Sequence, residues 1–155
     1  MMAAIDIADD AWTRVADLEA LTERAIGATL KHVGGDGNVE VDVLFAGDAE
    51  AARLNNVWRG KDYAPNILSF PAPQVQNMPP GEPRPLGDLI LASGTVAREA
   101  EQQGKPLTSH LTHLIVHGTL HLLGFDHLAQ ADAERMEKTE IAILAELGVP
   151  DPYLI

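Results

Sequence analysis

The sequence predicts a single α+β domain in which a small mixed sheet of about four strands packs with helices around a buried, histidine-bearing central helix. Three observations lead to this prediction. Segments with helical spacing of apolar residues are interspersed with short alternating segments. One helical segment, residues 109–123, is apolar on nearly all sides, which is typical of a buried helix. The chain has 155 residues, a length expected for one domain covering residues 1–155.

The N-terminal part predicts an amphipathic helix of about 20 residues, because apolar residues recur at steps of three and four over residues 12–33. Asp9 or Asp10 is expected to cap its start, since a carboxylate can accept a free N–H of the first turn. Gly34 and Gly35 are expected to end it.

The next segments predict two strands separated by a short helix. Residues 39–45 alternate between apolar and acidic side chains, as in a strand with one buried face. Asp48 is expected to cap a helix over residues 48–58, and residues 66–70 are expected to form the second strand. The following loop, residues 71–86, holds six of the ten prolines, and a loop of this length is usually functional or mobile.

The C-terminal half predicts a further strand and three helices. The strand covers residues 87–92, and Ser93 is expected to cap a helix that ends at Gly104. Thr108 is expected to cap the histidine-bearing helix, and residues 131–147 are expected to form the last helix.

Composition narrows the class of protein. Hydrophobic residues make up 46% of the chain, as in a globular protein, and there is no cysteine, which excludes disulfides and thiolate ligands. We expect neither a signal peptide nor a membrane span, and a cytoplasmic location. The net charge of −12 argues against indiscriminate nucleic-acid binding, so an RNA enzyme of this composition needs a local basic patch or a partner that delivers the substrate.

Three histidines, His117, His121 and His127, form the main candidate site. Positions four apart lie on one helix face, so His117 and His121 can direct their rings to one point. A histidine at the eighth position would lie about 12 Å along the axis, too far to join them. Gly124 can take the left-handed conformation that ends a helix and lets the chain bring His127 back. Three imidazoles beside an open position are typical of catalytic zinc, so we predict one Zn²⁺ per chain.

Packing is the alternative explanation for these histidines, because a single histidine on an apolar helix is usually a core residue. Three at this spacing, with Asp126 beside the last, favour a metal site. Asp126 is expected to orient a ligand histidine, the commoner role, or to act on the bound water. His110 and His113 extend the stripe by one turn, where simple packing competes with contacts to the ligand histidines or to the substrate.

A zinc ion with an open position lowers the pKa of bound water toward about 7, which indicates hydrolysis. The spacing also resembles the metzincin protease motif, H-E-x-x-H-x-x-G-x-x-H. Gly118 stands where those enzymes have the glutamate that acts as general base, which argues against peptide hydrolysis. Arg59 and Lys61 form a separate candidate site for phosphate, because an arginine can bind a phosphate through two hydrogen bonds, although a solvated loop arginine is the alternative.

Beyond these residues, the sequence resembles the YbeY endoribonuclease family. Its motif, H-G-x-L-H-L-x-G-x-D-H, occurs from His117 to His127 without a departure. Four further segments are similar: residues 54–62, 66–71, 86–90 and 151–153. The resemblance covers about residues 50–153, and one departure is Pro65, where the family usually has threonine.

The resemblance implies an α+β fold, a zinc ion held by the three motif histidines, and a metal-dependent endoribonuclease specific for single strands. It implies roles in maturing ribosomal RNA, notably the 3′ end of the small-subunit RNA, and in ribosome quality control. Expected partners are therefore RNA and the ribosome or its small-subunit proteins. The conserved loop arginine of the family maps onto Arg59.

Two alternatives remain at this point. One is a zinc peptidase. The other is a non-catalytic ribosome-assembly factor with a structural zinc, for which His113 or Asp126 would have to supply a fourth ligand. The sequence also leaves open whether metal-activated water or the ribose 2′-OH attacks the phosphate, and it leaves the oligomeric state open.

Overall fold

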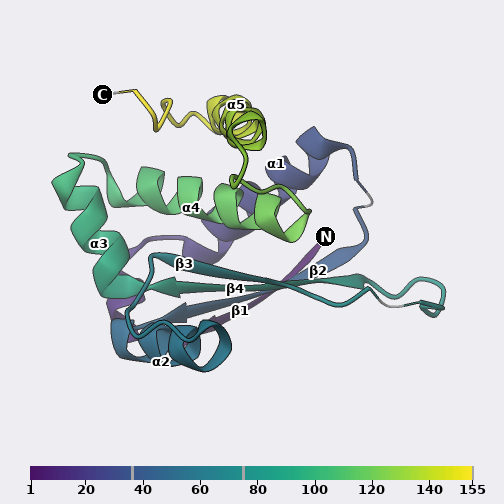
Figure 1. Cartoon of the computed structure of the whole chain (residues 1–155), viewed down its shortest axis with the longest axis horizontal. Helices are drawn as coiled ribbons and strands as arrows, with labels where there is room; N and C mark the ends of the chain where they lie inside the picture. Colours follow the sequence, from purple (N-terminus) through teal and green to yellow (C-terminus); the bar gives the residue numbers. More distant parts are fainter. Residues whose placement is uncertain (36, 75, 155) are drawn as a thin grey trace.

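In the computed structural model of the chain, residues 1–35, 37–74 and 76–154 are described, and they form one four-stranded sheet with helices on both faces (Figure 1). The elements in chain order are β1 (Met2–Ile7), a short 3₁₀ helix (Asp10–Arg14), α1 (Leu18–Val33), β2 (Val39–Ala46), α2 (Asp48–Arg59), β3 (Ile67–Pro71), β4 (Arg84–Ala92), α3 (Ser93–Gln102), α4 (Leu107–Leu122) and α5 (Gln130–Glu146). The predicted α+β fold with a small mixed sheet is confirmed.

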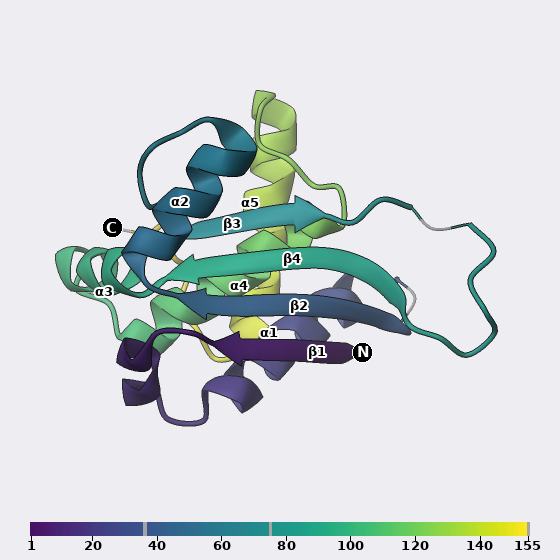
Figure 2. The same ribbon diagram turned by 90° about the horizontal axis from the view of Figure 1, so that it is seen from below.

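The strands follow the order β1-β2-β4-β3, with β1, β2 and β4 parallel and β3 antiparallel at one edge (Figure 2). Val43 at the centre of β2 lies opposite Ile5 of β1 and Leu89 of β4. Because side chains alternate between the faces of a strand, Val43 and Phe45 enter the main core, whereas Leu44 faces α2.

Helices α1, α4 and α5 cover one face of the sheet, and α2 covers part of the other (Figure 1). Helix α4 lies between the sheet and α5, and Leu111, Ile115 and Leu120 on it are fully buried. The predicted buried central helix is therefore confirmed. None of the helices among the described residues is long and apolar enough to cross a membrane.

Gly118 permits the close approach of α4 to the sheet. A Cβ atom at this position would lie 2.7 Å from Ile67 Cδ1 of β3 and 2.9 Å from Leu89 Cδ2 of β4. Both distances are shorter than ordinary van der Waals contacts, so a side chain here would push α4 away from the sheet. Gly118, which stands where metzincins have their glutamate, therefore faces the core of this protein.

The N-terminal part differs from the prediction. Strand β1 was not expected, and the predicted helix over residues 12–33 is divided into the 3₁₀ helix and α1. Asp17 adopts a left-handed conformation with φ of 53° at the start of α1, which changes the chain direction. Trp12 is thereby free to donate its indole N–H to the Ala46 carbonyl at 2.8 Å, while Asp9 caps the 3₁₀ helix. The apolar spacing does correspond to helical structure, but the division into two helices depends on the tertiary contact of Trp12.

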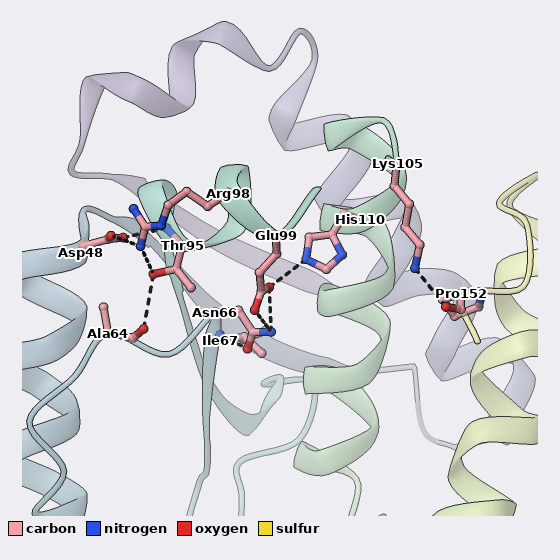
Figure 3. A network of polar contacts seen from close by, with 10 residues as sticks. All are labelled: Asp48, Ala64, Asn66, Ile67, Thr95, Arg98, Glu99, Lys105, His110 and Pro152. Carbon is pink, nitrogen blue, oxygen red and sulfur yellow. Dashed lines mark hydrogen bonds and ion pairs between the residues drawn. The ribbon is translucent and has the colours of Figure 1, made fainter. Parts of the chain in front are cut away.

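Three predicted helix caps are wrong. The residues at the cap positions of α2, α3 and α4 are Gly47, Ala92 and Pro106 rather than Asp48, Ser93 and Thr108. The Asp48 carboxylate instead accepts the backbone N–H of Thr95 at 3.0 Å, in the first turn of α3 (Figure 3). A side chain from a neighbouring helix thus satisfies an N–H that a local cap was expected to satisfy. The long loop is also shorter than predicted, because β4 already begins at Arg84.

Candidate metal centre

Helix α4 presents the histidine pair as its spacing predicts. His117 and His121 lie one turn apart with their Nε2 atoms 3.1 Å from each other. About an ion with nitrogen bonds of about 2.05 Å in tetrahedral geometry, ligand atoms are about 3.3 Å apart. The separation of the two Nε2 atoms therefore fits two ligands of one ion.

The chain after α4 brings His127 to the pair. Gly124 has a φ of 97°, in the left-handed region, and its N–H donates to the His121 carbonyl at 3.0 Å. The next N–H, of Phe125, donates back to the Leu120 carbonyl at 3.0 Å, which closes the end of the helix. The His127 ring centroid then lies 5.0 Å from that of His121 and 5.7 Å from that of His117. One nitrogen from each ring lies within 4.8 Å of the other two.

The Nδ1 atoms of His117 and His121 are hydrogen-bonded, and these bonds determine which ring nitrogen is free to bind a metal. His121 Nδ1 lies 3.0 Å from the Phe125 carbonyl oxygen, and His117 Nδ1 lies 2.6 Å from Glu140 Oε1. Both oxygens can only accept, so each Nδ1 carries the proton and each Nε2 keeps its lone pair. This arrangement of a protonated Nδ1 and a free Nε2 is common among metal-binding histidines.

Burial also keeps His121 in the form that can bind a metal. Burial lowers the pKa of His121, and the neighbouring His117 and His127 lower it further. The ring is therefore neutral at pH 7. His127 is exposed, so the cluster opens to solvent on the side of the loop that follows α4.

Glu140 on α5 anchors this arrangement, and the sequence analysis missed it. Its side chain is fully buried and accepts hydrogen bonds from His117, from His113 at 3.2 Å and from the Tyr153 hydroxyl. Burial alone would raise the pKa of Glu140, but these three hydrogen bonds outweigh it and lower the pKa to about 2. The carboxylate is therefore ionised throughout the physiological range.

A sequence signal for Glu140 did exist. Met136 and Ile143, which lie four residues before it and three after it, are both buried on α5. A glutamate on the apolar face of a helix needs a partner, because burying an unpaired charge is costly. The pattern indicated that such a partner exists, but not which residue it is.

His113, His117 and Glu140 also lie close enough to be a second group of potential ligands. However, 2.6 Å between His117 Nδ1 and Glu140 Oε1 is a hydrogen-bond distance and shorter than the spacing of ligands about one ion. His113 Nε2 is bonded to the same carboxylate, so His113 does not point its Nε2 at the three-histidine cluster.

Asp126 lies outside these contacts. It is exposed, and its carboxylate accepts the N–H of Leu128 at 3.3 Å within the loop. No hydrogen bond joins Asp126 to a histidine in the part of the chain that the structure describes. The side-chain N–H groups of the candidate ligands His117 and His121 donate instead to Glu140 and to the Phe125 carbonyl.

Arg59 and Lys61 lie apart from the histidines. Arg59 is the last residue of α2, which packs on the opposite face of the sheet from α4 (Figures 1 and 2), and both cations are exposed. Over residues 1–35, 37–74 and 76–154, no hydrogen bond or ion pair links either one to the histidine cluster. Asn55 holds the Arg59 loop by donating to the Tyr63 carbonyl at 3.0 Å.

Comparisons with known proteins agree with this geometry. The family model described as Endoribonuclease YbeY matches residues 5–148. Proteins named Endoribonuclease YbeY are similar over most of the chain. One from Rhodopseudomonas palustris is 49% identical and covers 93% of this chain and 76% of its own. One from Bradyrhizobium diazoefficiens is 46% identical and covers 98% of this chain and 85% of its own. A solution structure of a protein from Thermotoga maritima has the same fold, with a TM-score of 0.58 at 23% identity over 99% of this chain and 100% of that one.

Proposed function

The chain belongs to the YbeY endoribonuclease family, and on this premise we propose that it is a zinc-dependent enzyme that cuts single-stranded RNA during ribosomal RNA processing. Members of this family are endoribonucleases, so the enzyme is a hydrolase and RNA is its substrate. The proposal extends to the 3′ end of the small-subunit RNA, to ribosome quality control and to association with the ribosome in the cytoplasm. It assigns the activity to one domain over residues 1–155.

The observation that carries the proposal is the convergence of three histidine nitrogens on one point. In this proposal His117, His121 and His127 hold Zn²⁺. A zinc ion held there would polarise a phosphoryl oxygen and lower the pKa of water. The metal position is reachable by substrate because His127 is exposed.

The protein's own groups then have separate tasks. Glu140 keeps His117 in one orientation by accepting its Nδ1 proton. Arg59 binds a phosphate of the RNA and stabilises the negative charge that develops on it, and Lys61 adds positive charge beside it. Asp126 shapes the loop that carries His127, by its hydrogen bond to the Leu128 N–H.

The two alternatives receive less support. A peptidase of metzincin type needs a general base at position 118, where a Cβ atom would already contact Ile67 and Leu89. A structural zinc needs a fourth protein ligand, but His113 is bonded to Glu140 and Asp126 to a backbone N–H. A zinc ion held by His117, His121 and His127 would therefore have room for a water molecule or substrate as its fourth ligand.

The test compares the wild type with His117→Ala and Arg59→Ala for bound zinc and for cleavage of single-stranded RNA. We expect His117→Ala to lose metal and activity, and Arg59→Ala to keep its metal while activity falls about a hundredfold or more. Arg53→Ala is the matched control, because Arg53 is exposed on the same helix and its partner among the described residues is Glu50.

Two outcomes would overturn parts of the proposal, and the product ends decide a further point. Normal cleavage by Arg59→Ala would remove the phosphate-binding role. A wild type that holds zinc but cuts no RNA would favour the assembly factor. Product ends separate the two nucleophiles, because a 2′,3′-cyclic phosphate requires attack by the ribose 2′-OH.

A further inference from the structure

A hollow of about 600 Å³ lies beside the histidine cluster. It is enclosed by residues after α3, by the first turns of α4 and by the C-terminal residues. Its wall includes Gln102, Gln103, Lys105, His110, His113 and Tyr153. His117 also borders it, so the hollow adjoins the candidate metal centre.

Two buried imidazoles in this wall have an unused nitrogen. His110 is 4% exposed and its Nε2 lies 2.9 Å from Glu99 Oε1 (Figure 3), whereas its Nδ1 has no partner among the described residues. His113 repeats the pattern, with Nε2 on Glu140 and Nδ1 without a partner in the described part of the chain. Since each carboxylate takes a proton from Nε2, each Nδ1 is a hydrogen-bond acceptor. Both Nδ1 atoms are themselves shielded by protein, so the two imidazoles contribute ring surface to the wall rather than hydrogen bonds to a ligand.

The charge of the hollow is nearly balanced. Lys105 is the cation of its wall and Glu99 the anion, and each is already engaged. Lys105 donates to the Pro152 carbonyl at 2.9 Å, and Glu99 accepts from His110 and from Asn66 at 3.0 Å (Figure 3). A phosphate would meet no concentration of positive charge here. An uncharged group with N–H donors fits better.

Tyr153 adds a flat apolar surface. Its ring is 40% exposed and packs edge-on against His113, with 5.6 Å between the ring centroids. The ring is held in place because its hydroxyl donates to Glu140 and its own N–H donates to Asp151 at 2.8 Å. Aromatic side chains of this kind stack on the bases of single-stranded nucleic acid.

We propose that this hollow binds one base of the RNA, next to the phosphodiester bond that is cut, by stacking on Tyr153 and hydrogen bonding to the amides of Gln102 and Gln103. The assignment rests on the proposed function, because it takes the neighbouring histidines as the cutting centre. It explains how an acidic protein holds an RNA strand with few cations: stacking and hydrogen bonds replace part of the phosphate attraction.

The experiment uses a matched pair of variants, Tyr153→Phe and Tyr153→Ala. Both lose the hydroxyl that donates to Glu140, but only Tyr153→Ala loses the ring. Binding of adenosine and cytidine to the zinc-loaded protein is followed by NMR at residues of the hollow, with ribose 5-phosphate as the probe that lacks a base. We expect Tyr153→Ala to bind the nucleosides at least about tenfold more weakly than Tyr153→Phe, from the stacking contribution of one base.

A second measurement places the base relative to the cut. RNA substrates with one abasic position are compared by kcat/KM in both variants. When the abasic position is the one adjacent to the cut, Tyr153→Phe and Tyr153→Ala should have the same kcat/KM. Gln103→Ala should weaken nucleoside binding, whereas Gln130→Ala, an exposed glutamine on α5, should not.

The outcomes separate the two proposals. The base site would be overturned if Tyr153→Phe and Tyr153→Ala bound the nucleosides equally well. It would also be overturned if ribose 5-phosphate, which lacks a base, caused the same NMR shifts as the nucleosides. Neither result would contradict RNA cleavage. Nucleosides that bind in the hollow of a protein that cuts no RNA would overturn the proposed function and the link to cleavage, but not the base site itself.

Discussion

At the scale of single residues, the orientation of His117 depends on one buried carboxylate. Glu140 accepts the Nδ1 proton of His117 at 2.6 Å and is itself held by His113 and the Tyr153 hydroxyl. Such contacts behind a ligand histidine fix both the ring and its tautomer, and they raise the basicity of the nitrogen that binds the metal.

Replacing Glu140 with glutamine should therefore weaken metal binding without removing a ligand. Glutamine has the same shape but only one acceptor oxygen and no charge, so it cannot serve three donors. We expect Glu140→Gln to lower zinc affinity about 10- to 100-fold, measured by competition with a chelator of known affinity. Glu137→Gln, at an exposed position of the same helix, should leave the affinity unchanged. Equal affinities for the two variants would show that Glu140 does not position His117.

At the scale of elements, the separation of α4 from the sheet depends on Gly118. This glycine places the helix backbone against Ile67 of β3 and Leu89 of β4, because a Cβ atom added at position 118 would lie within 3 Å of both side chains. The histidines on the same helix are consequently held by a rigid support, which favours a preorganised site.

Gly118→Ala should destabilise the protein although alanine is the better helix former. The added methyl group overpacks the interface, which costs about 1–3 kcal/mol. Gly27→Ala is the control, since this glycine lies within α1 and a Cβ atom there would make only one ordinary contact, at 4.0 Å. Gly27→Ala should raise the free energy of unfolding by about 0.5–1 kcal/mol. Urea unfolding measures both, and stabilisation by Gly118→Ala would contradict the close packing described here.

The contact between α2 and α3 gives a prediction that depends on pH. Burial alone would raise the pKa of Asp48, but its hydrogen bonds to the Thr95 N–H and to Arg98 outweigh this and lower the pKa below its ordinary 3.8. The folded state therefore favours the ionised form, so the contribution to stability is present above pH 3.8 and is lost as the pH falls through the lower, folded-state pKa.

Asp48→Asn should accordingly destabilise the protein at pH 7 more than at the acid end of the range in which it stays folded. The measurement is the free energy of unfolding in urea at several pH values for both proteins. Asp62→Asn serves as the control, because Asp62 is exposed and no hydrogen bond of its side chain occurs among the described residues. A difference that does not change with pH would mean that the Asp48 charge is not involved.

At the scale of the whole molecule, the candidate metal centre connects three parts of the chain. His117 and His121 come from α4, His127 from the loop after it, and the supporting Glu140 from α5. A metal ion that binds only the folded state stabilises it by about 2.7 kcal/mol at a free concentration of 100 times Kd.

Zinc should therefore raise the Tm of the metal-free protein, and a chelator should reverse the change. His127→Ala tests the assignment, because His127 is exposed and its loss should leave the Tm without metal nearly unchanged while abolishing the rise. The measurement is thermal unfolding followed by circular dichroism. If zinc raises the Tm of His127→Ala as much as that of the wild type, the ion binds elsewhere, for instance among His113, His117 and Glu140.

The local sequence determined the parts of this protein that depend on short-range geometry. The spacing of His117 and His121, the buried character of α4 and the strand β2 follow from periodicities of two or about four residues, and the helix end at Gly124, with its φ of 97°, follows from the conformational freedom of glycine. Such periodicities describe a single helix or strand, and they hold wherever it packs.

Only the tertiary structure decided which distant residues meet. Glu140 reaches His117 from 23 positions away, Asp48 satisfies the first turn of α3, and β1 gains its place by pairing with β2. The same packing places α2, which ends at Arg59, and α4, which carries His117 and His121, on opposite faces of the sheet. These contacts depend on the order of the strands and on the face that each helix covers, because burial across the whole core selects among arrangements that the local pattern leaves equivalent.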